Sequence, residues 1–501
     1  MDIDNELVHI SGPETTKTIA MQKLETMGYP EKGHNSLIDK AKILREIGKS
    51  LGRPRSSSSG DSQGALKSYE KSLEMLKQAA ANNPSDERAL LELASTYDLL
   101  GEMYEQAGEF QQAMNYYTDS MSIRQKLAKI DLLGSSYTKI GDIRESRENW
   151  VGASKMFKRN LEIKKEALSK DPKNLKLKQQ ACTVYTRIAE FMAKLGELYQ
   201  EIDEDFAVKF FEKAIIYNQK MIDIVRESVA TEPKNPSYER YMAGCLLQQG
   251  AVVFKTGKYA ESRLHLSKAL EIFEKHAKND EQNIDLKWKL ARNYGYFGES
   301  LLEAGQLDKA IVFLNRSVSI LSDCVKRDSA NRWFREDIEQ FHYFLVIGYL
   351  RKNDPSALSA MQAFLQMYKD TSYVIPPETN HTLEFLRKTR GLYKEIYRKK
   401  LDSHLLDILK ESFYWYKQNV SMKRKLEQVE YAFTLLTLEG KEAKEQEVLS
   451  IIKGCEKSLK QKDVIAQFRL SQIYSLLGEK EHGKKIYKTV HALLEKELEG
   501  I

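Results

Sequence analysis

The sequence has few cysteines, few prolines and no long hydrophobic run. Its four cysteines stand far apart, with no CxxC and no Cys/His spacing: Cys182, Cys245, Cys324 and Cys455. Such a set builds neither a disulfide framework nor a zinc site, and it favours a reducing, cytoplasmic location. The ten prolines leave long proline-free runs, which is typical of helices with short connections. The apolar run Phe341–Leu350 is too short to span a bilayer, and the acidic start is unlike a signal peptide, so we expect no membrane contact.

Motifs of the common enzyme classes are absent as well. The sequence contains no HExxH, GxSxG, Walker or GxGxxG motif. Its nine histidines are scattered, and we expect His265 and His342 to be ordinary residues of helices. The sequence therefore predicts a protein that is not an enzyme, with no catalytic residue, no metal and no cofactor.

The most regular stretch is Leu91–Ala128, which reads as two amphipathic helices folded back on each other. Its first half carries small and aromatic residues at helical spacing, and Gly108 then interrupts the helix. Its second half alternates small and bulky residues on one face. A small residue opposite a bulky one allows two helices to pack closely. The positions concerned are Tyr97, Leu100, Gly101 and Tyr104 in the first helix, and Ala113, Tyr117 and Ser120 in the second.

The second-helix pattern recurs in a constant register. Its six copies begin 48, 40, 54, 55 and 48 residues apart. The recurring positions include Ala65, Tyr69, Ala153, Phe157, Ala207, Phe211, Leu266, Ala269, Ala310 and Leu314, and the matching small positions of first helices are Gly101, Gly141, Gly250 and Gly298. This pattern resembles the tetratricopeptide repeat, and its long period implies extended helices. We therefore expect an all-α superhelical solenoid. In the fourth unit, two packing faces fit equally well, one around Tyr185–Ala189 and one around Met192–Tyr199.

The predicted organisation has four parts. Residues 1–35 are expected to be irregular, residues 36–370 to form six to seven helix pairs, and residues 371–380 to be a linker. Residues 381–501 are expected to form a basic helical C-terminal domain ending in a repeat-like pair. They hold 24 Lys+Arg and 18 Asp+Glu, which is the whole positive surplus of the chain.

A second resemblance covers about residues 13–328. The segment that runs from Gly48 through Gly52-Arg53-Pro54 and Gly60-Asp61 to Ser72-Leu73, together with Ser11–Thr16, is similar to the repeat region that follows the catalytic domain of certain bacterial serine/threonine protein kinases. This resemblance implies a stand-alone regulatory part of a bacterial signalling system. The sequence has no glycine-rich phosphate loop, HRD or DFG motif, so it implies no kinase activity.

In tetratricopeptide arrays the first helices line a concave groove that holds a protein segment. Register places twelve residues there: Asp98, Glu102, Glu105, Asp142, Glu145, Glu190, Leu247, Ala251, Phe254, Arg292, Glu299 and Leu302. The groove would start acidic and become apolar, which favours a basic ligand. We therefore expect a protein-binding adaptor. The alternative is a nucleic-acid-associated regulator that uses the interleaved basic and tyrosine residues of 381–501. The sequence predicts neither a particular partner nor an oligomeric state.

Overall fold

The computed structural model describes residues 34–52, 61–147, 149–200, 204–233, 235–329, 331–369, 381–399, 403–419, 425–457, 459 and 464–498. Within these residues the chain forms twenty helices and no strand, so the all-α prediction is confirmed. The first helices of successive pairs are α3 (His34–Gly52), α5 (Glu87–Ala107), α7 (Ile130–Ser146), α9 (Leu175–Gln200), α11 (Pro236–Lys255), α13 (Ile284–Glu303), α15 (Arg332–Lys352), α17 (His381–Lys399), α19 (Lys425–Glu439) and α21 (Val464–Leu477). The second helices are α4 (Ser62–Asn82), α6 (Phe110–Lys126), α8 (Trp150–Lys170), α10 (Glu204–Thr231), α12 (Tyr259–Asn279), α14 (Leu307–Arg327), α16 (Ser356–Lys369), α18 (Ser403–Asn419), α20 (Lys441–Glu456) and α22 (Lys480–Leu498).

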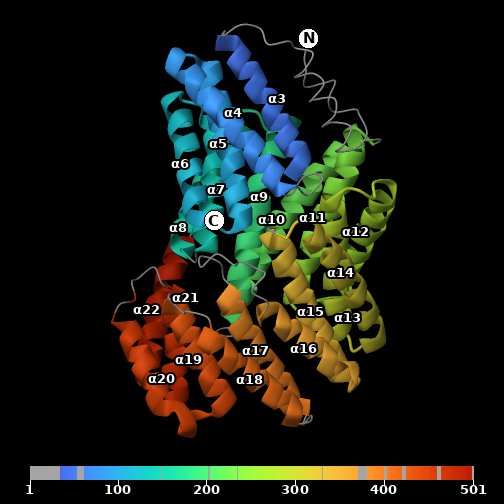
Figure 1. Cartoon of the computed structure of the whole chain (residues 1–501), viewed down its shortest axis with the longest axis vertical. Helices are drawn as coiled ribbons and strands as arrows, with labels where there is room; N and C mark the ends of the chain where they lie inside the picture. The colour runs from blue at the N-terminus through green and yellow to red at the C-terminus, as the bar shows by residue number, and fades with distance from the viewer. Residues whose placement is uncertain are drawn as a thin grey trace.

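The helix pairs stack in chain order and wind into a compact superhelix (Figure 1). The N-terminal pairs lie at the top of this view, α11 to α16 curve down the right-hand side, and α17 to α22 return beneath α8. The predicted segment 1–35, apart from its last two residues, and the linker 371–380 lie outside the described residues. So does the serine-rich stretch 53–60.

Local sequence explains where the helices begin and end. The side chains of Asp86, Asn283 and Asn331 accept hydrogen bonds from backbone N–H groups of the first turn that follows them. They satisfy donors that have no partner within the helix. Gly108 ends α5 with a φ of 82°, a left-handed conformation that costs glycine little. These stop-and-restart signals give ten antiparallel pairs within the described residues.

Glycines of the first helices meet bulky residues of the second helices. A Cβ atom placed on Gly101 would lie 2.3 Å from Cε1 of Tyr117, and one on Gly196 would lie 2.5 Å from Cε1 of Phe211. Only a residue without a side chain permits this approach. The Gly196 contact places Met192–Tyr199 against α10. The Tyr185 ring of the other face also lies against Tyr217 of α10, with centroids 5.8 Å apart, so both faces considered for the fourth unit pack on the second helix. All twelve repeat positions are buried: Gly101, Ala113, Tyr117, Gly141, Ala153, Phe157, Ala207, Phe211, Gly250, Ala269, Gly298 and Ala310.

One hydrophobic cluster continues from α13 to α21. It contains Leu314, Phe341 and Phe364 of the expected solenoid together with Phe385 and Leu435 of the expected C-terminal domain. The helices after residue 380 therefore share a core with α13 to α16. They also continue the alternation of first and second helices, so the hydrophobic core is continuous between α16 and α17.

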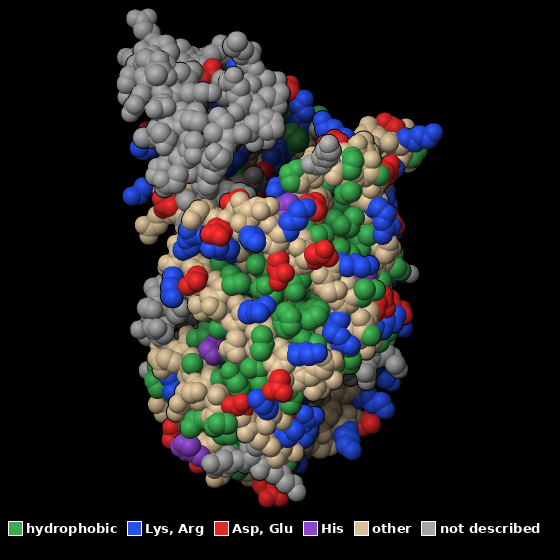
Figure 2. All heavy atoms as spheres, turned by 90° about the vertical axis from the view of Figure 1, so that its right-hand side faces the viewer, with side chains coloured by type: hydrophobic (Ala, Val, Ile, Leu, Met, Phe, Trp, Pro, Cys, Tyr) green, Lys and Arg blue, Asp and Glu red, His purple; other side chains and the backbone are tan. Residues whose placement is uncertain are grey.

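The outer face of the molecule is mixed in character. Figure 2 shows hydrophobic side chains gathered among Lys, Arg, Asp and Glu on the side formed by α12 and α14. Leu264 and Val312 are exposed there at the same repeat position, two residues after Ser262 and Ala310. The most continuous arrangement of charged side chains lies instead between the first helices.

His342, on α15, makes the fold sensitive to acid. Burial lowers the pKa of His342 to about 4, and its ring lies against that of Phe364, with centroids 6.3 Å apart. An unfolded histidine has a pKa near 6.5, so the unfolded chain binds the proton first and stability falls as the pH drops from 6.5 towards 4. We expect a loss of about 2 kcal/mol between pH 6.5 and pH 5 from this residue. Denaturant unfolding of His342→Phe at both pH values should show a smaller loss than the parent, and equal losses would contradict this assignment.

Candidate functional site

Charged side chains join every pair of neighbouring first helices from α3 to α21. We call this series of contacts the ion-pair ladder. Its N–O distances range from 2.7 to 3.5 Å in the following pairs: Lys42–Glu92, Lys139–Glu102, Arg187–Asp142, Lys255–Glu197, Lys255–Glu299, Arg292–Asp337, Arg351–Glu395, Arg390–Glu430 and Arg469–Glu430. Because first helices form the inner face of such a superhelix, the ladder lines the surface where a ligand is expected.

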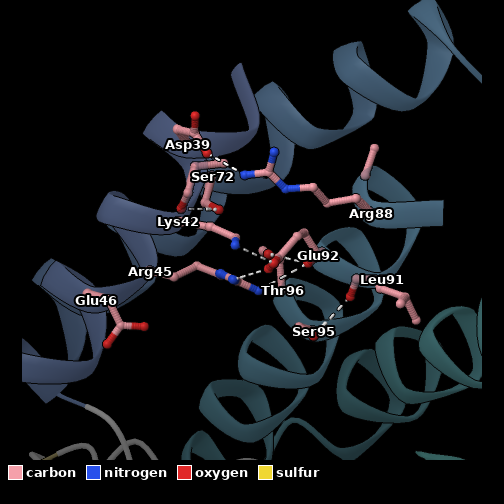
Figure 3. A network of polar contacts seen from close by, with 12 residues as sticks. Asp39, Lys42, Arg45, Glu46, Ser72, Arg88, Leu91, Glu92, Ser95 and Thr96 are labelled. Carbon is pink, nitrogen blue, oxygen red and sulfur yellow. Dashed lines mark hydrogen bonds and ion pairs between the residues drawn. The ribbon is translucent and has the colours of Figure 1, made fainter. Parts of the chain in front are cut away.

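The first step of the ladder joins α3 to α5 (Figure 3). Lys42 and Arg45 both pair with the carboxylate of Glu92, and Arg45 also donates to the Glu92 backbone carbonyl over 3.2 Å. One turn earlier on α5, Arg88 pairs with Asp39 over 2.6 Å. Figure 3 shows these side chains converging between two helices that are not consecutive in the chain. Each contact therefore fixes how one repeat is placed on the next.

The carboxylates that were expected to attract a ligand already have partners within the chain. Asp98 accepts from Arg124 over 2.7 Å, and Glu105 accepts from the Tyr117 hydroxyl over 2.8 Å. Asp98, Glu105, Glu145 and Glu299 are buried. The prediction of an open acidic groove therefore needs correction at these four residues, since each packs between helices.

Arg187, on α9, is the centre of the third step. It pairs with Asp142 over 2.8 Å, lies 3.7 Å from Glu145, and also contacts Glu190 on its own helix. Burial opposes its charge, but Asp142 and Glu145 outweigh this effect and raise its pKa further. Glu190 stays 41% exposed, and it is the most accessible of the seven predicted carboxylates.

In the middle of the ladder, Lys255 bridges Glu197 of α9 and Glu299 of α13, each over 3.5 Å. Burial raises the pKa of Glu299, although Lys255 opposes this rise. Glu197, which the sequence analysis did not select, remains 48% exposed. The accessible part of this region therefore contains carboxylates from α9 beside the ammonium group of α11.

The predicted apolar contacts are only partly accessible. Leu247 and Leu302 are buried in the core, at 5% and 2% exposure, so they do not present a surface to a ligand. Ala251 and Phe254 are half-buried, and Phe254 packs on Tyr259. Arg292 is half-buried, and its guanidinium stacks on the rings of Trp288 and Tyr296 while it pairs with Asp337. Leu247 and Leu302 were predicted to line the groove, but the helices pack so closely that these side chains are buried between them.

The basic residues of the C-terminal helices are also engaged in part. Arg387, Arg390 and Arg469 surround the single carboxylate of Glu430, at 3.4, 2.8 and 2.8 Å. Tyr397 is 69% exposed and stacks on Tyr393. The surface available for nucleic acid is therefore smaller than the sequence indicates, because two of the basic residues on α17 serve the fold.

Sequence reasoning placed Arg292 in the groove but did not select four other cations of the ladder. Lys139, Arg187, Lys255 and Arg351 lie on first helices, but their partners on neighbouring first helices are 37 to 58 residues away in the chain. The sequence did contain an indication of these pairs. Each cation lies on a first helix, and a neighbouring first helix carries a carboxylate. To predict the pairs from this indication, one must know how neighbouring repeats are placed relative to each other in the superhelix.

The four cysteines are buried, and burial raises the pKa of the Cys182 thiol to about 11 and that of Cys245 to about 12. These thiols stay protonated near neutral pH, which makes them poor nucleophiles. Within the described part of the chain there is no cluster of three or more His, Cys, Asp or Glu side chains that could hold a metal. A search of the same residues found no helix long and apolar enough to cross a membrane.

Comparison with known proteins agrees with this architecture. Residues 93–131 match the sequence profile of the tetratricopeptide repeat. The apo form of RapI has 12% identity and a TM-score of 0.50, over 81% of this chain and 94% of that one. A Rap protein complexed with competence and sporulation factor has 13% identity and a TM-score of 0.47, over 93% and 100%. The apo quorum sensor NprR from B. thuringiensis has 13% identity and a TM-score of 0.41, over 89% and 96%.

No curated protein matches the chain in sequence. Identities this low establish the fold alone, and the match of residues 93–131 overlaps the stretch Leu91–Ala128 that the sequence analysis found most regular. The chain is therefore a helical solenoid of the tetratricopeptide type, with a tetratricopeptide repeat at residues 93–131.

Proposed function

We propose that this chain is a non-enzymatic adaptor that binds a segment of a partner protein on the inner face of its superhelix. The observation that carries this proposal is the continuous row of first helices from α3 to α21, joined by the ion-pair ladder. Repeat solenoids use such extended concave surfaces for binding. The Rap protein that resembles this fold is complexed with a competence and sporulation factor, which is an example of a ligand held by a similar solenoid.

The binding region lies on α9 and α11. Glu190 and Glu197 are the accessible carboxylates there, Lys194 is 43% exposed, and Phe254 offers a half-buried ring. A partner segment that carries a Lys or Arg near an apolar side chain would match this arrangement. The resemblance to repeats that follow bacterial kinases remains a prediction, and it would make a catalytic chain one candidate partner.

The test begins with a pull-down from native lysate, followed by affinity measurements with the purified partner. The double variant Glu190→Lys/Glu197→Lys should bind about tenfold more weakly at low salt, because each reversal replaces attraction with repulsion. The difference should shrink at high salt, since these carboxylates are accessible and therefore screened.

A matched control uses Glu162→Lys/Glu166→Lys on α8. These carboxylates are 51% and 68% exposed and pair only with cations of their own helix in the contacts described. The control has the same net charge as the test variant. The proposal is wrong if the test variant and the control bind the partner equally well at every salt concentration.

A further inference from the structure

The two longest helices among the described residues form a docking surface for the last helix pair described. Helices α9 and α10 contain 26 and 28 residues, whereas α11 to α14 contain 20 or 21. The extra length adds Tyr199 at the end of α9 and Phe206 and Phe210 at the start of α10. These three rings pack on one another with centroids 4.9 to 5.3 Å apart.

The last pair, α21 and α22, rests on these rings. The Phe468 ring of α21 meets Tyr199 edge-on at 4.9 Å, and the His491 ring of α22 lies 4.3 Å from Phe206. Ala466, Phe468 and Val490 are buried in the same cluster as Trp150, Phe191 and Tyr199. We call this contact the aromatic joint. Figure 1 shows α21 and α22 beneath the lower end of α8, although about three hundred residues of chain separate the two regions.

A second contact joins two turns of the superhelix. Gln106, at the end of α5, donates to the Asp328 carboxylate over 2.8 Å, and the Ser62 hydroxyl donates to the same oxygen over 2.9 Å. The Arg332 guanidinium also lies 5.0 Å from the centre of the Phe110 ring. Together with the aromatic joint, these contacts hold successive turns of the superhelix against each other.

Several cations of the inner face are already engaged in this conformation, although Glu190 and Glu197 stay accessible. Arg187, Lys255 and Arg292 are held between carboxylates and rings of adjacent helices. The two contacts between turns differ in chemistry. Ring packing is driven by burial of apolar surface and can be released without stranding a charge, whereas release of the Asp328 contact would remove the Gln106 and Ser62 donors from a buried carboxylate.

We propose that α21 and α22 are a removable closing element, whose release from α9 and α10 at the aromatic joint opens the inner face to a partner segment. The purpose of this opening, access for a partner segment, rests on the proposed function. The opening itself can be measured in the chain without a partner. When the pair leaves, Tyr199, Phe206 and Phe210 become exposed, and the solenoid from α11 to α20 acts as the hinge that carries the pair outward.

The experiment measures the distance across the joint in the full chain without any partner. Spin labels are attached to cysteines introduced at the exposed positions Gln200 and Lys488, after the four buried native cysteines are replaced by alanine. Pulsed electron paramagnetic resonance should give a short distance in this reference chain. Phe206→Ala/His491→Ala should shift a large part of the distribution to longer distances, and small-angle X-ray scattering should show a larger radius of gyration.

Phe313→Ala serves as the control, because its half-buried ring packs on Tyr294 and Phe297 far from the joint. Circular dichroism must show that every variant keeps its helix content, and the milder pair Phe206→Leu/His491→Ala replaces the first variant if it unfolds. An unchanged distance in a folded joint variant would overturn the inference. A chain that opens but binds no partner segment would refute the proposed function and leave the opening established.

Discussion

Replacing Glu430 with alanine should lower the free energy of unfolding by about 3–5 kcal/mol. The Glu430 carboxylate is fully buried, and Arg390 and Arg469 beside it are 3% and 5% exposed. Burial alone would raise the pKa of Glu430, but the three guanidiniums outweigh this and hold it well below its usual range. Without the carboxylate, buried positive charges face each other with no anion between them. Loss of one member of a buried charged group usually costs this much.

Urea unfolding at pH 7 would measure the effect. Glu430→Gln should fall between the alanine variant and the parent, because its amide oxygen can still accept from Arg469. Glu162→Ala, which removes a half-exposed partner of Arg159, should change stability by less than about 1 kcal/mol. Equal stability of the Glu430→Ala and Glu162→Ala variants would mean that the buried pairs contribute no more than exposed ones.

The acid response separates Glu430 from His342. A carboxylate with a depressed pKa contributes stability above its unfolded pKa and loses it as the pH falls through its folded pKa. The contribution of Glu430 should therefore persist at pH 5, where that of His342 is already being lost.

Introducing leucine at Gly101 should cost about 3 kcal/mol. The glycine lies against the fully buried ring of Tyr117, whose hydroxyl donates to Glu105, so the ring cannot move without breaking that hydrogen bond. Overpacking of a filled contact typically costs 1–3 kcal/mol, and the 2.3 Å approach of even a Cβ atom places this site at the upper end.

The matched control is Gly244→Leu on α11. A Cβ atom there would meet nothing within 4 Å, so leucine should stabilise the chain by about 0.5–1 kcal/mol through its better helix propensity. Thermal unfolding of both variants tests the pair of expectations. Two shifts of the same sign and size would show that backbone propensity, rather than packing, governs these glycines.

The repeat register could be predicted because it depends on spacing within one helix pair. Gly101 and Tyr117 are sixteen residues apart, and their types alone indicate close packing. The charges of the groove could not be predicted in the same way. Whether Asp142 is accessible depends on Arg187, which reaches it from the next repeat, 45 residues along the chain. Sequence patterns give the residues on each inner face, but the twist between units decides which of them meet.

The aromatic joint could likewise not be predicted from local sequence patterns. Tyr199 and Phe468 belong to different turns of the superhelix, and neither departs from ordinary helical spacing. The unusual length of α9 and α10 was the available indication, because extra turns beyond the common repeat need some partner to cover their apolar side chains.

The ion-pair ladder also gives the molecule a mechanical character. Its bonds run between repeats rather than within them, so stretching or twisting the superhelix strains the ladder while each helix pair remains intact. Lys255 and Glu430 are each shared by two neighbours, which means that displacement of one repeat is passed to the repeats on both sides. We therefore expect the repeats to move together along the inner surface. This coupling should weaken where dissolved salt screens the accessible ion pairs.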